Sequence, residues 1–129
     1  MKRHAIRFAN HFAELVASGK KCSTVRRLRQ ADIPALGDTL EFYHAGQLDN
    51  GYLVATVGFG RCISVSEITV QKGGLITLDG RALTLIGGEV LANNDGFESL
   101  EAFIAFIERH YGLPFSGQLI EWESLDKGE

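Results

Sequence analysis

A short run at residues 18–29, SGKKCSTVRRLR, surrounds a Ser-Thr pair at positions 23 and 24 with two lysines and three arginines. A hydroxyl group is a poor nucleophile until a base removes its proton. A lysine acts as that base when burial and nearby cations lower its pKa below the ordinary value of about 10.4. Lys21 has Lys20 and Arg26 close by in the sequence, so this run supplies what a lysine-activated hydroxyl needs.

Strand geometry divides the cations of this run into two groups. Side chains alternate between the faces of an extended strand, so Thr24 and Arg26 share one face while Arg27 and Arg29 share the other. In such a strand Lys21 falls on the face opposite to Thr24. We therefore expect the chain to kink at the start of the strand, where Lys21 would join Thr24 and Arg26 in a pocket.

Asp95 is a second candidate, in the stretch NNDGFES at 93–99. An acid at such a turn commonly caps backbone amides. Alternatively, Asp95 lies beside Lys21 and either orients it or holds a substrate amide. A carboxylate next to Lys21 also stabilises the protonated amine and opposes its use as a base, so an ion pair that only binds ligand stays open.

A helix must precede the basic run. Apolar residues recur at helical spacing from Ala9 to Ser18, with Asn10 placed to cap the helix and Gly19 to end it. Residues 22–29 then read as a strand, because they alternate and are rich in β-branched types. The basic run is thus a predicted helix-to-strand junction.

The rest of the chain predicts mainly strands, at 37–44, 52–70, 75–78, 82–86 and 118–124, with a hairpin turn at 49–51. Gly58 and Gly60 indicate a bend or bulge in the long strand. Residues 88–94 are expected to form one or two helical turns, and Ser99 to cap a helix ended by Gly112 and Pro114. This order predicts an α+β fold, a small, mostly antiparallel β-barrel flanked by two or three helices.

Composition and charge limit the class of protein. With 45% hydrophobic and 22% charged residues, the 129-residue chain is typical of a globular protein, and we expect a single domain over 1–129. Residues 1–29 hold eight basic residues and one acid, whereas residues 95–129 hold eight acids and two basic residues. A basic face on a chain of net charge −3 favours an anionic partner such as RNA or a nucleotide. The alternative is that the two segments pair with each other or are solvated.

Other functional classes find little support in the sequence. Apolar runs are far shorter than the roughly 20 residues that span a bilayer, and no leader opens the chain, so we expect a cytoplasmic protein without a membrane partner. Cys22 and Cys62 are then expected as reduced thiols. No Cys-x-x-Cys or His-x-x-x-His pair occurs, so we predict no metal and no cofactor.

Several segments together resemble the ASCH domain, a PUA-like β-barrel family. They are SGKKCSTVR, GDTLEFY, DGFESLEAFIAFI and GQLIEW, and the likeness covers the chain from about Ile6 to Glu123. The pattern G-x-K-x-x-T-x-R of the first segment is the signature of the family. The hairpin expected within KGGLITLDGRALTLI, around residues 70–90, is an addition to the most compact members.

The resemblance implies a function that involves RNA or nucleosides. The family includes amidohydrolases that remove acetyl from N4-acetylcytidine with a lysine, a threonine and a glutamate, and other members are proposed to bind or cleave RNA or to act as coregulators. Carried over, Lys21 is the base, Thr24 the nucleophile and Arg26 the arginine of the pocket. Asp95 takes the place of the glutamate, with a side chain one methylene shorter.

Two non-catalytic hypotheses remain beside the enzyme. In the first, the basic strand binds RNA, with phosphates contacting Lys20, Lys21, Arg26, Arg27 and Arg29, while an aromatic residue stacks on a base. The candidates for stacking, each also a candidate for the core, are Tyr43, Phe59 and Trp122. In the second, the basic strand binds a protein partner, whose nature the sequence does not indicate.

Overall fold

The computed structural model describes residues 2–48 and 51–125, and the fold is α+β, built on one mostly antiparallel sheet. In the described residues the elements are, in chain order, β1 (Arg3–Arg7), α1 (Asn10–Ser18), β2 (Ser23–Arg26), the 3-10 helix η1 (Gln30–Asp32), β3 (Thr39–Leu48), β4 (Gly51–Val70), β5 (Ile76–Leu78), β6 (Arg81–Ala82), α2 (Leu85–Asn94), α3 (Leu100–Tyr111) and β7 (Phe115–Leu125). The predicted hairpin is present as the β3–β4 pair, but residues 49 and 50 of its turn lie outside the described residues.

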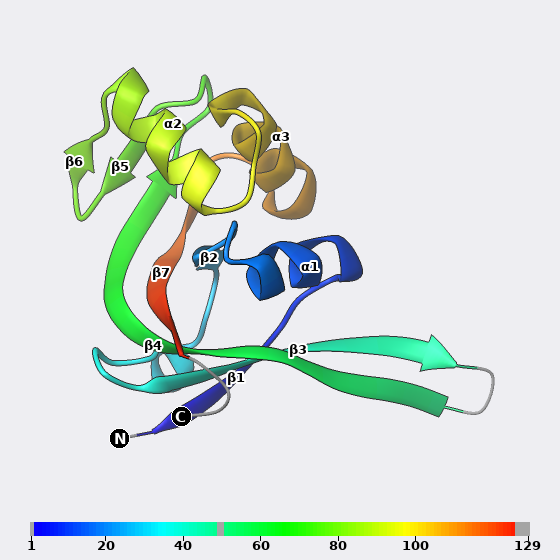
Figure 1. The fold of residues 1–129 in the computed structure, drawn as a ribbon. Coiled ribbons are helices and arrows are strands. Elements are labelled where there is room, and N and C mark those ends of the chain that lie inside the picture. Colours follow the sequence, from blue (N-terminus) through cyan, green and yellow to red (C-terminus); the bar gives the residue numbers. More distant parts are fainter. Residues whose placement is uncertain (1, 49–50, 126–129) are drawn as a thin grey trace.

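The long strand β4 gives the sheet its shape. Its first part pairs with β3 and its later part with β7, both antiparallel, while β1 joins the other edge of β3 in parallel. Figure 1 shows β4 running out of a projecting β3–β4 hairpin and then bending toward α2 and α3. The ladder shifts register between Phe42 and Tyr43, opposite Gly58, which confirms the bulge expected there. The sheet is not closed, so the predicted barrel is an open, strongly bent sheet.

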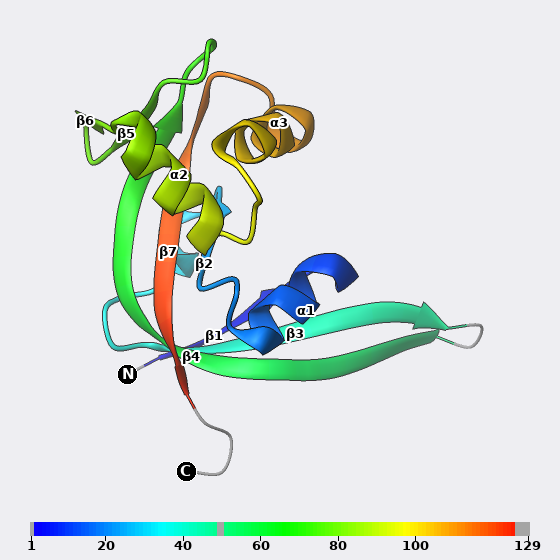
Figure 2. The same ribbon diagram turned by 45° about the horizontal axis from the view of Figure 1, so that its top comes forward.

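Two hydrophobic clusters pack on this bent sheet. The α1 cluster lies where α1 meets β1, β3 and the middle of β4, and the α3 cluster lies where α2 and α3 cover the far part of β4 and β7 (Figure 2). The α1 cluster comprises Ile6, Phe8, Ala13, Val16, Leu40, Phe42, Cys62, Ile120 and Trp122. The α3 cluster comprises Val25, Ile68, Val70, Ile76, Leu91, Ala92, Phe103, Ile107, Phe115 and Leu119.

Local capping chemistry sets the ends of the helices. Gly19 adopts φ 82°, the left-handed conformation that ends α1 as predicted. The hydroxyl of Ser99 accepts from the amide of Ala102 and caps α3, also as predicted. The cap expected at Asn10 is wrong, because Ala9 occupies the N-cap position of α1 and no side chain caps it.

Three boundaries differ from the sequence prediction. The strand expected over 22–29 ends at Arg26, and the chain goes on to form η1. The strand expected over 82–86 ends at Ala82, because the hydroxyl of Thr84 accepts from the Gly87 amide and starts a helix at Leu85. Helix α2 is consequently longer than the one or two turns predicted over 88–94.

Candidate active site

Lys21 occupies the junction between α1 and β2 and points inward. Its backbone amide donates to the carbonyl of Leu15 at 3.0 Å, which turns the chain back under α1 before β2 begins. The Lys21 side chain is only 4% exposed and lines a cavity of about 260 Å³. Thr24 and Arg26 line the same cavity, so the expected kink is present and brings the three residues of the signature together.

Asp95 reaches this junction from the end of α2. Lys21 Nζ donates to the main-chain oxygen of Asp95 at 2.6 Å and to its carboxylate Oδ1 at 3.1 Å. Ser23 Oγ donates to the same Oδ1 at 2.9 Å. Gly96 follows with φ 92°, and a Cβ there would lie 3.3 Å from that of Lys21. Of the two sequence interpretations of Asp95, the contact with Lys21 is the one observed.

Burial and attraction have opposite effects on the pKa values of this pair. Removal from water lowers the pKa of Lys21, and this effect is larger than the opposing attraction of the Asp95 carboxylate. Burial likewise raises the pKa of Asp95 despite the nearby ammonium. Arg26 lowers the pKa of Lys21 further through charge repulsion. Each member of the pair is therefore shifted toward its neutral form.

Thr24 lines the same cavity as this pair and contacts Arg26. The hydroxyl of Thr24 is buried and accepts from Arg26 Nε at 3.0 Å, as expected for two residues on one face of a strand. The other end of the guanidinium donates to the carbonyl of Arg7 at 2.7 Å, and its carbon lies 5.0 Å from the ring centre of Phe8. Arg26 is thus held over the cavity from two sides, with a donor directed at the threonine oxygen.

Aromatic side chains form the remaining walls. Lys21 Nζ is 5.0 Å from the ring centre of Phe12, and His110 packs against Phe106 with ring centres 4.0 Å apart and the planes tilted by 39°. Tyr43, Phe59 and Trp122, the candidates for stacking, do not line the cavity. The aromatic residues that do are Phe8, Phe12, Phe97, Phe106 and Tyr111. Helical spacing marks Phe12 as a core residue, so the sequence did not identify it as part of a cavity wall. The one available signal was the DGF stretch, which places Phe97 close to Asp95.

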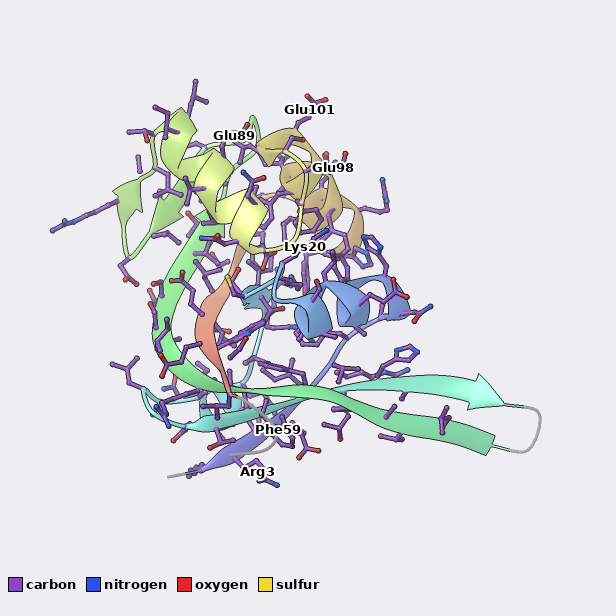
Figure 3. All side chains as sticks on the ribbon, in the orientation of Figure 1. Arg3, Lys20, Phe59, Glu89, Glu98 and Glu101 are labelled. Atoms are coloured by element: carbon purple, nitrogen blue, oxygen red, sulfur yellow. The ribbon has the colours of Figure 1, made fainter. Side chains whose placement is uncertain are left out.

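The other predicted ligand-binding cations lie outside this cavity. Arg27 is exposed, and its guanidinium lies 5.0 Å from the ring centre of Phe115. Arg29 pairs with Asp32 at 3.0 Å on the surface. Lys20 is exposed near the ends of α2 and α3 (Figure 3). Their contact with an anionic ligand stays a prediction.

Several other features bear on the functional class. Cys22 and Cys62 are free thiols. Within residues 2–48 and 51–125 no group of three or more His, Cys, Asp or Glu side chains is placed to hold a metal ion. In the same part of the chain, each helix is too short or too polar to cross a membrane.

No known family profile matches this sequence, and no curated protein does. Solved structures match the fold. The crystal structure of ASCH from Zymomonas mobilis covers 98% of this chain and 75% of its own, at TM-score 0.57 and 16% identity. A serine-to-alanine mutant of that protein, ZmASCH, covers 95% of this chain and 68% of its own, at TM-score 0.59 and 16% identity. A tyrosine-to-phenylalanine mutant covers 99% and 78%, at TM-score 0.56 and 15% identity.

Proposed function

Because this chain has the ASCH fold, of the PUA-like class, we propose that it is an amidohydrolase that removes acetyl from N4-acetylcytidine or a similar acylated nucleobase. The observation that carries the proposal is the position of Lys21. It is buried, its pKa is lowered, and it shares one cavity with Thr24, Arg26 and Asp95. A lysine in this state is a candidate general base, and Thr24 is the hydroxyl available to it.

The cavity suits a planar ligand of nucleoside size. Its volume of about 260 Å³ is just below the ~300–1,000 Å³ found for small-molecule sites, as expected for a small ligand. Its aromatic walls offer faces on which a base stacks, as single bases do in proteins that recognise unpaired nucleotides. Arg26 and Lys21 supply donors for carbonyl oxygens of the ligand. A single modified base therefore fits this cavity better than several consecutive nucleotides.

The proposed chemistry is acyl transfer through Thr24. Neutral Lys21 takes the hydroxyl proton as Thr24 Oγ1 bonds to the acetyl carbonyl carbon. The C–N bond then breaks, and Lys21 returns the proton to the leaving N4 amine. Water next attacks the acetyl-threonine ester with Lys21 as base, which releases acetate and restores the threonine. Cytidine and acetate are the products of one acetylcytidine and one water.

Arg26 and Asp95 have supporting roles in this scheme. Arg26 Nε already donates to the Thr24 oxygen, so it stabilises the alkoxide and then the oxyanion as negative charge develops. Asp95 holds Lys21 through two contacts and is itself held by Ser23. Its carboxylate raises the pKa of Lys21, so it limits the fraction of neutral amine while fixing the position of Nζ.

The experiment measures free cytidine by liquid chromatography after incubation of the purified protein with N4-acetylcytidine. Thr24→Val keeps the shape of the side chain but removes the hydroxyl, and we expect it to reduce turnover to the level without protein. Thr24→Ser is the matched control and should retain measurable activity. Absence of turnover by the wild-type protein, where a known acetylcytidine amidohydrolase is active, would refute the proposal. Unchanged activity of Thr24→Val would show that a group other than Thr24 is the nucleophile.

One observation favours a second candidate function, ligand binding without turnover. Lys21 donates to both a carbonyl and a carboxylate, which are the contacts expected of a protonated ammonium. In that case N4-acetylcytidine binds, as measured by calorimetry, and no cytidine appears. If the ligand is RNA held through Lys20, Arg27 and Arg29, affinity should fall steeply with added salt and on Arg27→Ala.

A further inference from the structure

A second hollow lies on the other side of α3 from the candidate active site. It is a groove of about 720 Å³ between α3, α2 and the loop that joins β4 to β5. Three partly buried apolar residues, Leu100, Ile104 and Leu113, line it. Its lining is completed by Lys72, Gly73, Gly74, Glu89, Glu101, Ala105 and Glu108. The groove therefore combines an apolar surface with a mostly acidic rim.

Glycines keep one wall of this groove free of side chains. Gly74 has φ 94°, and a Cβ built on it would lie 3.2 Å from Ile104 Cδ1. The β4–β5 loop is therefore packed directly against α3, and Gly73 beside it leaves backbone at the surface. Ala105, the small exposed residue of α3 in the groove, likewise leaves room for close approach. An element lying along α3 would meet a shallow, smooth apolar strip.

The acids of the rim have a regular spacing. Glu101 and Glu108 are seven residues apart on α3, which places them about 10.5 Å apart along the helix on one face. Glu89 stands across from them on α2, and its Oε2 accepts from the Leu100 amide at 3.3 Å. In the described residues none of these three carboxylates forms an ion pair. Figure 3 labels Glu89 on α2 and Glu101 on α3, the two neighbouring helices of the groove.

Apolar surface continues from the groove onto the first turn of α2. An adjoining hollow shares Gly73, Gly74 and Leu100 with the groove and adds Leu75 and Leu85. Leu75 and Leu85, which line this hollow, are 52% and 80% exposed, and Ile86 and Val90 elsewhere on α2 are exposed as well. Exposed apolar surface beside a groove with a charged rim is characteristic of a protein interaction site.

We propose that this groove binds an amphipathic helix of a partner protein, with apolar residues on one face and two lysines or arginines seven positions apart. Such a helix would lay its apolar face on Ile104 and Leu100 while its cations meet Glu101 and Glu108. Charge complementarity selects this partner, because the same acids repel the phosphates of nucleic acid. The site is separate from the Lys21 cavity, so the proposal does not depend on the proposed function.

The experiment uses the full chain and a model peptide as the probe. The peptide is an 18-residue amidated helix of leucine and lysine with lysines at seven-residue spacing, and its control carries glutamate in place of lysine. Nitrogen–proton correlation spectra of the labelled protein locate the contact, and fluorescence anisotropy gives the affinity. We expect saturable binding of the lysine peptide, with shifts confined to residues 72–75 and the exposed face of α3, and no binding of the control.

Charge variants test the same contact. Glu101→Lys with Glu108→Lys should weaken binding about tenfold, because two attractions become repulsions. Glu14→Lys with Glu67→Lys makes the same charge change at exposed sites elsewhere and should change affinity less than twofold. Both pairs are on the surface, so folding is retained.

Three outcomes would overturn the proposal. The first is no saturable binding of the lysine peptide, and the second is shifts spread equally over all acidic surfaces. The third is a dimer of the protein alone, seen by sedimentation and abolished by Glu101→Lys with Glu108→Lys, because a second copy then covers the groove.

Discussion

Breaking the buried ion pair between Lys21 and Asp95 should strongly destabilise the fold. Both side chains are about 4% exposed, and Nζ and Oδ1 are 3.1 Å apart. Lys21→Met keeps an unbranched stem of similar length but removes the ammonium, and it leaves the carboxylate buried without its cation. Removal of one partner of a buried pair costs about 3–5 kcal/mol, a fifth or more of the ~5–15 kcal/mol by which proteins of this size are stable.

The assay is urea unfolding followed by circular dichroism and by the fluorescence of Trp122, the single tryptophan. Asp95→Asn and the double variant with Lys21→Met complete a double-mutant cycle. We expect the double variant to lose less free energy of unfolding than the sum of the two single variants, because it buries no uncompensated charge. Lys72→Met makes the same chemical change in an exposed loop and should cost less than about 0.5 kcal/mol.

The pH dependence of Lys21→Met gives a second check on the same pair. Burial already raises the pKa of Asp95, and loss of the ammonium removes a main opposing effect. A raised folded-state pKa means that the folded protein binds a proton that the unfolded chain has released, so the variant gains stability as the pH falls. Its deficit relative to the wild type should shrink as the pH falls from neutral toward the ordinary carboxyl pKa of about 4. A cost below about 1 kcal/mol at neutral pH, or a deficit that grows on acidification, would refute this account of the pair.

Three further predictions concern other parts of the fold. The pKa of Asp38 is lowered to about 2, chiefly by the Ala35 amide and by His4, so its stabilisation is present above about pH 4 and lost as the pH falls through 2. Asp38→Asn should therefore be less stable than wild type in thermal melts at pH 7, and the difference should disappear below about pH 2. A Cβ at Gly60 would lie 2.9 Å from the rings of Phe42 and Trp122, so Gly60→Ala should cost about 1–3 kcal/mol in urea unfolding and shift the tryptophan emission, whereas an unchanged spectrum would contradict that packing. Ser99→Ala removes the cap of α3 and should cost about 0.5–2 kcal/mol in the same assay, with Ser99→Asp restoring most of it.

Local sequence signals predicted the signature part of the candidate site well. Strand alternation placed Thr24 and Arg26 on one face, and the helix stop at Gly19 indicated the kink that turns Lys21 toward them. The role of Asp95 was harder to predict, because an acid in a turn next to glycine has two common roles and sequence alone does not choose between them. Its contact with Lys21 depends on how α2 packs beside β2, which is a tertiary property.

The features that sequence missed are those set by long-range packing. An open sheet and a closed barrel have the same alternation along each strand, and the distinction depends on where β4 leaves β3 and joins β7. The length of helix α2 was underestimated because residues 82–86 have side chains typical of a strand. The Thr84 cap overrides that preference and starts the helix at Leu85. The role of Ser23 as a donor to Asp95 had no sequence signal beyond its place beside Thr24.

The cavity of the candidate active site lies between the α1 cluster and the α3 cluster. Phe8 belongs to the α1 cluster and Ile107 to the α3 cluster, and both line the cavity. The Cys22 amide donates to the Asn94 carbonyl at 2.8 Å, next to the buried ion pair, and so joins the two sides. Clusters of this kind can open as separate cooperative units. The Cys22 amide should then exchange its hydrogen with solvent faster than amides in the middle of β4, and a ligand that contacts both clusters should slow that exchange.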